Sequence, residues 1–199
     1  MTGGGGRIAR VGKPAYTVAV TGALCPKRRR GVFPMRRKDR EMPREFGLSV
    51  LDRCEYATLA LIDPDGFPYC VPITIVREGD ALYFHSAREG YKADCLMREP
   101  RVCLSCVGDT RRPPDKFTTE YESAIITGTA APVTNPEEKL HALRLLCQRH
   151  TPTNMAMFDS EAARSLPRTA VWKISIHTLT AKRKKYDENG VEMKYGRIE

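Results

Sequence analysis

The residues best placed to do chemistry lie between Leu82 and Lys92, where an apolar stretch ends at a histidine and a serine. A short helix is predicted to begin just afterwards, with Gly90 before it and Lys92 in its first turn. Backbone N–H groups at a helix start are unpaired and carry the positive end of the helix dipole. Together with the Ser86 hydroxyl and the lysine, they make a candidate phosphate site, and His85 lies where the rest of a phosphorylated cofactor must pass. The same residues also suit an ordinary strand–turn–helix junction with solvated charges, and the local sequence alone favours that second interpretation.

The composition is that of a globular protein with one core-forming domain. The chain has 199 residues, of which 41% are hydrophobic and 29% are charged. It contains no run of 18 apolar residues, so we expect no membrane association. Its seven cysteines are scattered through apolar segments, which is typical of free thiols in a reducing compartment and predicts a cytoplasmic protein. Cys103 and Cys106 have C-x-x-C spacing but no second such pair, so we expect no metal site.

The positive charge is concentrated at the N-terminus. Residues 1–34 contribute seven of the nine net positive charges, which leaves +2 for the rest of the chain, and they hold seven of the 15 glycines. Two interpretations stay open for this segment: a disordered basic leader, or a mis-assigned start whose true first residue is Met35. We favour the second. The domain is then expected over 35–185, followed by a C-terminal tail over 186–199.

A balanced domain of this kind needs no nucleic-acid partner, because such binding requires a basic face on the folded domain. An alternative assigns nucleic-acid binding to the leader and to the basic run Lys182–Lys185, which is expected to be exposed. That alternative predicts a steep dependence of binding on salt.

The spacing of apolar residues predicts a mainly β protein with flanking helices. Asp63–Gly66 is a hairpin signal between two apolar runs, and Pro72 within the second run favours an edge position or a bulge. Asn135 is expected to cap a helix that begins at Pro136, and residues 108–119 are expected to form a polar loop. Further helices are predicted over 44–54 and 91–98. The short turns between strands indicate a six-stranded antiparallel barrel, with strands over 56–62, 68–77, 81–85, 101–107, 121–133 and 169–176.

Several motifs, taken in order, resemble a known superfamily. They are Gly66–Pro72, Leu82–Ala87, Gly90–Lys92, Pro100–Cys103 and Tyr121–Gly128. Their order and spacing are similar to those of the pyridoxamine 5'-phosphate oxidase-like, FMN-binding split-barrel superfamily, and within it the chain most resembles the nitroimidazole-resistance proteins. The resemblance covers residues 35 to about 185. It implies a six-stranded split β-barrel that forms a homodimer, with FMN at the subunit interface.

The resemblance also implies roles for individual residues. The backbone of one strand would line the flavin, through Val71, Pro72, Ile73 and Thr74. His85 and Ser86 would contact the ribityl–phosphate region, and Tyr91 and Lys92 would contact the phosphate.

Two further positions near the C-terminus, Trp172 and Lys182, match an aromatic and a basic residue that approach the cofactor in relatives. Trp172 suits a core position equally well. Tyr91 stands where many of the oxidases have arginine, which predicts weaker phosphate binding. Apolar residues and Thr74 replace the basic residues of the oxidases' second strand, which disfavours pyridoxamine phosphate as the substrate.

The function expected from these features is that of an FMN-dependent oxidoreductase. It would take a hydride from NAD(P)H and reduce a small acceptor such as a nitroaromatic (5-nitroimidazole) compound. His85 is the expected proton donor, because its ordinary pKa suits that task. His141, His150 and His177 are expected to be structural or exposed. The alternative is a non-catalytic protein that holds haem or another flavin-like ligand on the same barrel.

Overall fold

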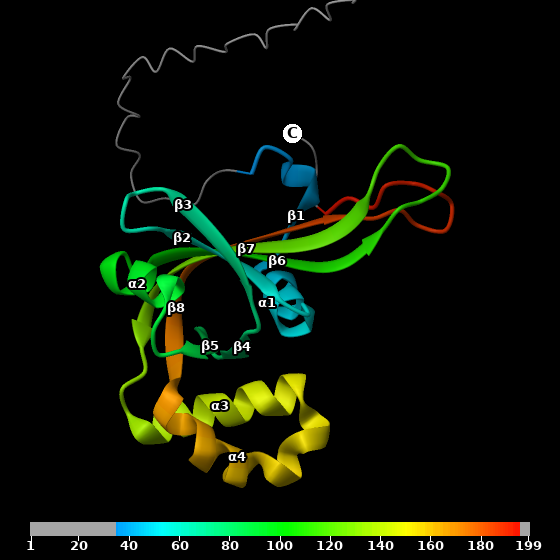
Figure 1. The fold of residues 1–199 in the computed structure, drawn as a ribbon. Coiled ribbons are helices and arrows are strands. Elements are labelled where there is room, and N and C mark those ends of the chain that lie inside the picture. Colours follow the sequence, from blue (N-terminus) through cyan, green and yellow to red (C-terminus); the bar gives the residue numbers. More distant parts are fainter. Residues whose placement is uncertain (1–34, 196–199) are drawn as a thin grey trace, which may run out of the picture. The chain divides into compact units, whose positions relative to one another are not determined.

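The structure is a computed structural model that describes residues 35–195 and consists mainly of one antiparallel sheet. Predictions about the leader and about the last four residues lie outside this range. The sheet order is β3-β2-β6-β7-β8-β5-β4, and β1 pairs with β8 (Figure 1). The eight strands are β1 (Glu41–Met42), β2 (Ala57–Ile62), β3 (Pro68–Ile73), β4 (Val76–Glu78), β5 (Ala81–Ala87), β6 (Arg101–Arg111), β7 (Glu120–Pro132) and β8 (Thr169–Lys184).

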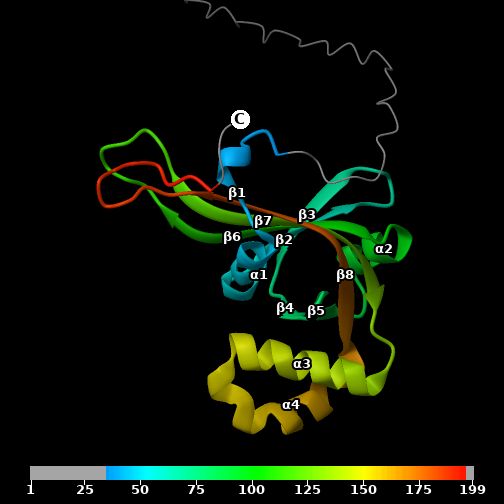
Figure 2. The ribbon, with the colours of Figure 1, turned by 180° about the vertical axis from the view of Figure 1, so that it is seen from behind.

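The sheet curls because its two end strands are neighbours in the chain. β3 and β4 lie at opposite ends of the strand order, yet only Thr74 and Ile75 separate them. The ends must therefore approach each other, and Figures 1 and 2 show the sheet wrapped into an incompletely closed barrel. Pro72 lies in the end strand β3, so the predicted edge position is confirmed.

The predicted fold, an antiparallel split barrel with flanking helices, is confirmed, although the strand count differs. The return strand predicted over 68–77 is divided into β3 and β4, and the two-residue β1 was not predicted.

The barrel interior holds the main core. Alternate residues of β2 point inward, namely Ala57, Leu59 and Leu61, and they pack with Leu82 and Phe84 of β5. The helices α1 (Arg44–Arg53) and α2 (Tyr91–Arg98) contribute to the same cluster. Every second side chain of a strand faces the other way, so each strand also has an outward-facing set of residues.

A second cluster lies outside the barrel, under two further helices. α3 (Pro136–His150) and α4 (Phe158–Ser165) pack against Tyr83 and Val171 of the sheet. The predicted cap of α3 is confirmed, because Asn135 Oδ1 accepts a hydrogen bond from the backbone N–H of Glu138 at 2.9 Å. Among the described residues, no helix is both long and apolar enough to cross a membrane.

Two sequence predictions about strand ends were wrong. β8 continues to Lys184 instead of ending at Ile176, so most of the basic run Lys182–Lys185 is half-buried strand and only Lys185 is exposed. β6 likewise runs to Arg111, which shortens the predicted loop to 112–119. The β7–β8 pairing has a register shift at Gly128, where a Cβ would lie 2.4 Å from the carbonyl oxygen of Ser175.

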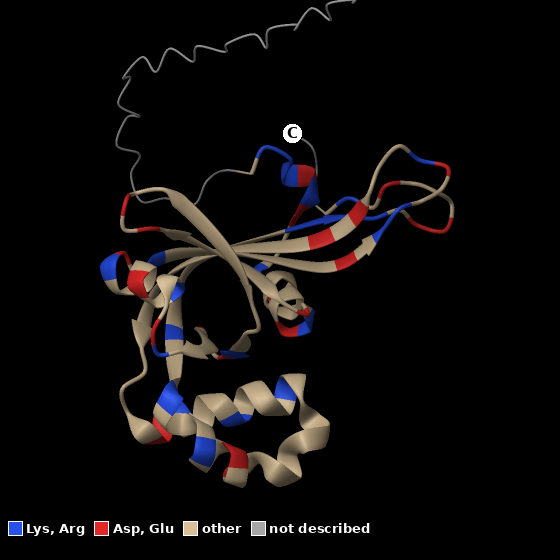
Figure 3. Ribbon diagram, viewed as in Figure 1, with Lys and Arg blue, Asp and Glu red and all other residues tan. Residues whose placement is uncertain are grey.

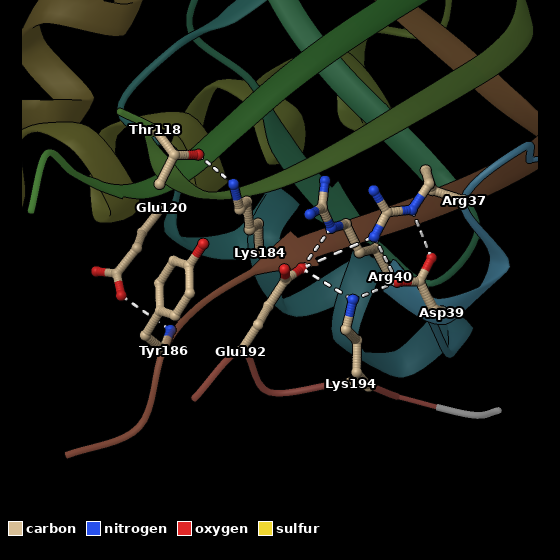
Figure 4. A network of polar contacts seen from close by, with 9 residues as sticks. All are labelled: Arg37, Asp39, Arg40, Thr118, Glu120, Lys184, Tyr186, Glu192 and Lys194. Atoms are coloured by element: carbon tan, nitrogen blue, oxygen red, sulfur yellow. Dashed lines mark hydrogen bonds and ion pairs between the residues drawn. The ribbon is translucent and has the colours of Figure 1, made fainter. Parts of the chain in front are cut away.

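Ion pairs join the start of the described chain to its end (Figure 4). Asp39 is only 3% exposed and accepts hydrogen bonds from Arg37, at 2.7 and 2.6 Å, and from Lys194 at 2.6 Å. These two cations hold the pKa of Asp39 well below its usual range. Arg40 donates to Glu192 at 2.6 Å. The described part of the predicted tail is therefore anchored to the barrel, while the domain boundary at residue 185 stays a prediction.

Candidate functional site

The junction between β5 and α2 forms the centre of the candidate site. β5 ends at Ala87, and α2 starts at Tyr91 directly after Gly90. Gly90 has φ = +125°, a conformation that other residues rarely adopt, and no atom lies within 4 Å of where its Cβ would be. Glycine is therefore required here by backbone conformation. The expected strand–turn–helix arrangement is confirmed.

Lys92 is a half-buried cation in the first turn of α2. Its Nζ lies 5.6 Å from the centroid of the Phe84 ring. Burial lowers its pKa, with no opposing contribution from an acidic group. Within residues 35–195, no carboxylate lies within ion-pair distance of Lys92. A partly desolvated cation without a counter-charge is suited to bind an anion.

Trp172 fixes the hydroxyl of Ser86 on the same face of β5 as Phe84, the ring over which Lys92 lies. Trp172 is the Cα partner of Phe84 across β8 and β5, and the two rings stack with centroids 6.4 Å apart. Its indole Nε1 donates to Ser86 Oγ at 3.1 Å, and Ser86 donates to the carbonyl oxygen of Ala87 at 2.7 Å. Trp172 is 3% exposed. It is thus a core residue whose polar edge orients Ser86.

His85 faces the opposite side of β5 from Phe84 and Ser86, and it is exposed. Its pKa is lowered from the ordinary value, chiefly because neighbouring atoms displace part of its hydration. The nearby charges of Lys92 and His150 lower it further. The neutral imidazole is therefore the main form at neutral pH.

The corner between β3 and β4 brings the predicted flavin-lining strand to the same end of the barrel. The β4–β5 ladder starts where Val76 pairs with Tyr83, and Thr74 and Ile75 form the corner just before it. The carbonyl oxygen of Ile75 accepts a hydrogen bond from Arg149 at 2.9 Å and lies 2.8 Å from the Nε2 atom of His150.

In β3, Val71 and Ile73 pack toward the core, whereas Pro72 and the following residue Thr74 are exposed. The side chains of Val71 and Ile73 are therefore turned away from an outer ligand, and their backbone groups are what they could offer. The hydrogen bonds of Arg149 and His150 were not predicted from the sequence. The only sequence signal for them was the presence of basic residues in the last turn of α3, which is common in helices.

Two predicted phosphate or cofactor residues are not brought to this cluster. The Tyr91 hydroxyl donates to Asp63 at 2.7 Å, which raises the pKa of Tyr91 to about 12, and its ring packs edge-on against Tyr69. Tyr91 therefore ties α2 to the β2–β3 hairpin. Lys182 lies ten residues beyond Trp172 on β8, a separation of about 30 Å along an extended strand.

The outward face of the sheet is almost uncharged. One row of paired residues crosses five strands, and Figure 3 shows β2 and β3 without charged residues. A second row runs beside it and includes a hydrogen bond of 2.7 Å between Thr127 and Thr178. Lys182, paired with Ser123, follows in the next row. The first row consists of Pro72, Thr58, Ser105, Ile125 and Thr180, and the second of Cys70, Ala60, Cys103, Thr127 and Thr178.

Among the described residues, no group of three or more His, Cys, Asp or Glu side chains is arranged to hold a metal ion. The polar groups gathered at the β5–α2 junction are instead a cation, a hydroxyl, an imidazole and free helix N–H groups. Such a set can bind a phosphate and hold a proton at a nearby ring nitrogen.

Comparisons with known proteins agree with this fold. Residues 44–183 match a family model described as pyridoxamine 5'-phosphate oxidase. A candidate 5-nitroimidazole antibiotic resistance protein from Bacteroides thetaiotaomicron is 24% identical, with a TM-score of 0.60 over 72% of this chain and 86% of that one. An FAD and haem binding protein from Mycobacterium smegmatis is 22% identical, with a TM-score of 0.64 over 80% and 87%.

An FAD-binding protein from Mesorhizobium loti is 16% identical, with a TM-score of 0.55 over 73% of this chain and 98% of that one. No curated protein matches the sequence significantly. At these identities the solved structures show the fold alone.

Proposed function

Because the chain belongs to the pyridoxamine 5'-phosphate oxidase family, we propose that it binds FMN and acts as a flavin-dependent reductase of small acceptors such as nitroaromatic compounds. The observation that carries the proposal is the setting of Lys92. It is a half-buried cation in the first turn of α2, it has no acidic partner in the described chain, and the Ser86 hydroxyl oriented by Trp172 lies at the same β5–α2 junction. This set fits the dianionic phosphate of FMN. The bound flavin supplies two-electron redox chemistry, with NAD(P)H as the proposed donor.

Different residues of the chain would contact different parts of the cofactor. Lys92 offers a charge-assisted hydrogen bond to the phosphate, and Ser86 can turn its hydroxyl from the Ala87 carbonyl toward the same oxygens. The first N–H groups of α2 lie beside them. On the other side of β5, the exposed Thr74 and the backbone of Val71 offer polar groups to the rest of the ligand.

His85 is the proposed proton donor at the site. It is exposed, so its ring nitrogens are open to a bound acceptor. Its lowered pKa makes the imidazolium a stronger acid than an ordinary histidine, although a smaller fraction carries the proton at neutral pH. We therefore expect proton transfer to be fastest on the acid side of neutrality.

The outward sheet face supports a homodimer. Its rows of small, hydroxyl and apolar side chains carry no charge before Lys182, and Ile125 there is 39% exposed. Such a surface suits association with a second copy of the chain. If FMN binds at the interface of a two-fold dimer, as the family resemblance implies, Lys182 of one copy would contact the FMN of the other copy despite its distance from Trp172 in the same chain.

A second candidate function is cofactor binding without turnover, with haem as the ligand. It is favoured by His85, because a neutral and exposed imidazole is a common axial haem ligand. The two candidates need different groups, since haem requires His85 and FMN requires Lys92.

The absorption spectrum of the purified full-length chain separates these functions. FMN binding predicts flavin bands, release of FMN on denaturation, and NAD(P)H-dependent reduction of a nitroaromatic acceptor. A Soret band that disappears in His85→Ala would support the haem function instead. Failure of the apo protein to bind added FMN would refute the proposed function.

A further inference from the structure

A buried pair of thiols lies on the inner side of the barrel, separate from the Lys92 cluster. Cys54 directly follows α1 and is 3% exposed, and Cys106 on β6 is fully buried. Cys106 pairs with Ala57 on the neighbouring strand β2. Ala57 lies three residues after Cys54 in the chain. The chain therefore runs from one cysteine into the strand beside the other, and both side chains belong to the same buried cluster.

Arg149 holds a guanidinium beside this pair. Its Nη2 lies 3.9 Å from the sulfur of Cys54 and donates to the carbonyl oxygens of Leu51 at 2.7 Å and Cys54 at 2.8 Å. Its Nη1 donates to the carbonyl oxygen of Ile75. The cation is thus fixed by three carbonyl groups and cannot easily turn away from the sulfur.

The two sulfurs have different acidities. Contact with Cys106 and the nearby guanidinium lower the pKa of Cys54, although burial opposes this. The same contact and burial raise the pKa of Cys106. One sulfur is therefore suited to react as a thiolate and the other to follow as a thiol.

We propose that Cys54 and Cys106 form an intramolecular disulfide when the protein meets a peroxide. The Cys54 thiolate attacks one peroxide oxygen, so that an S–O bond forms, the O–O bond breaks and hydroxide leaves. The Cys106 sulfur then attacks the Cys54 sulfur and gives up its proton, so that an S–S bond forms, the S–O bond breaks and water leaves. Two thiols are oxidised by two electrons, and one peroxide is reduced to two waters. The reaction needs no bound flavin, so it goes beyond the proposed function and is independent of it.

The outward face offers a matched pair that should not react. Cys70 and Cys103 both lie opposite Ala60, one on each side of β2. Two strand spacings separate them by about 10 Å, which exceeds the Cα separation that a disulfide can span. In a single copy of the chain they are more accessible than the buried pair, so in a monomer a reaction governed by exposure alone would modify them first.

The test is to treat the reduced full-length protein with hydrogen peroxide, block the remaining thiols, denature it and measure the intact mass. We expect two fewer alkylated thiols than the seven of the reduced chain and the loss of two hydrogen atoms. Cleavage after Tyr56 separates Cys54 from Cys70, and peptide mapping should then find Cys54 linked to Cys106. Because mapping uses the unmutated protein, it decides the question even if variants fold poorly.

Variants supply the control. Cys106→Ser should abolish the disulfide, whereas Cys103→Ser, three residues away on the same strand, should leave it unchanged. Retention of all seven alkylatable thiols, a link between other cysteines, or a link between two chains would overturn the proposal. None of these results depends on FMN binding, so the two proposals can fail separately.

Discussion

Replacing Lys92 by methionine should weaken FMN binding while leaving the fold intact. Loss of a hydrogen bond to a charged group costs about 1.5–3 kcal/mol, which is about ten- to a hundredfold in the dissociation constant. The cost to the free protein should be small, because the variant also removes a partly desolvated cation that has no acidic partner in the described chain. Methionine keeps an apolar stem over the Phe84 ring.

The chain offers a matched control for this variant. Lys173 also lies 5.6 Å above an aromatic ring, that of Tyr83, but its Nζ is paired with Glu138 at 2.8 Å. Lys173→Met therefore removes a lysine from a similar setting on the other face of β8, and FMN affinity should be unchanged.

Titration of the apo proteins with FMN and with riboflavin, followed by flavin fluorescence, measures both effects. Riboflavin lacks the phosphate, so Lys92→Met and the parent should bind it equally well. An unchanged FMN affinity in Lys92→Met, or an equal loss of riboflavin binding, would refute the assignment of Lys92 to the phosphate.

Four further outcomes are expected. Ile125→Glu places a charge in the proposed dimer interface and should give a monomer in sedimentation. Met97→Glu, at an exposed position of α2, should stay dimeric. A dimer in both variants would disprove the proposed interface. His85 should titrate below 6.5 when followed by NMR in the apo protein, and Lys92→Met should move that pKa upward, because a nearby cation disfavours the imidazolium. An unmoved pKa would show that the two charges do not interact. His85→Ala should lower turnover of a nitroaromatic acceptor and abolish its rise toward acid pH, while the thermal midpoint changes little; full activity would leave His85 without a catalytic role. Asn135→Ala should cost about 1 kcal/mol of stability in urea unfolding, while Asn135→Ser should retain most of it, and equal losses would argue against the cap.

Local signals predicted much of the fold. The Asp63–Gly66 turn, the edge position of Pro72 and the Asn135 cap each depend on residues a few positions apart, so the chain itself carries the information. The true end of β8 depends on pairing with β7 and β1, which lie far away in the sequence. The basic residues in that stretch were predicted to be an exposed tail, because no neighbouring residue indicates that they pair with β7 and β1.

The candidate site was predictable to the extent that it is built within one segment. His85, Ser86 and Lys92 follow one another at a single junction, and the structure gathers them there. The hydrogen-bond partner of Tyr91 is the carboxylate of Asp63 on the β2–β3 hairpin. The hydrogen bond to the Ile75 carbonyl comes from Arg149 near the end of α3. Both contacts join residues more than 25 positions apart, which no local pattern specifies.

The place of β8 in the sheet has a consequence for how the protein is made. β8 follows all the other described strands in the sequence, yet it lies between β7 and β5 and provides the hydrogen bonds that join the β4–β5 hairpin to the other strands. Until residues 169–184 leave the ribosome, the nascent chain holds two sheet fragments that are not joined to each other. Leu82 and Phe84 then lack their pairing partners on β8, Ile174 and Trp172. Residues 169–184 must therefore be synthesised before the domain can close, and a chain that stops short of β8 leaves open strand edges that can pair with other chains.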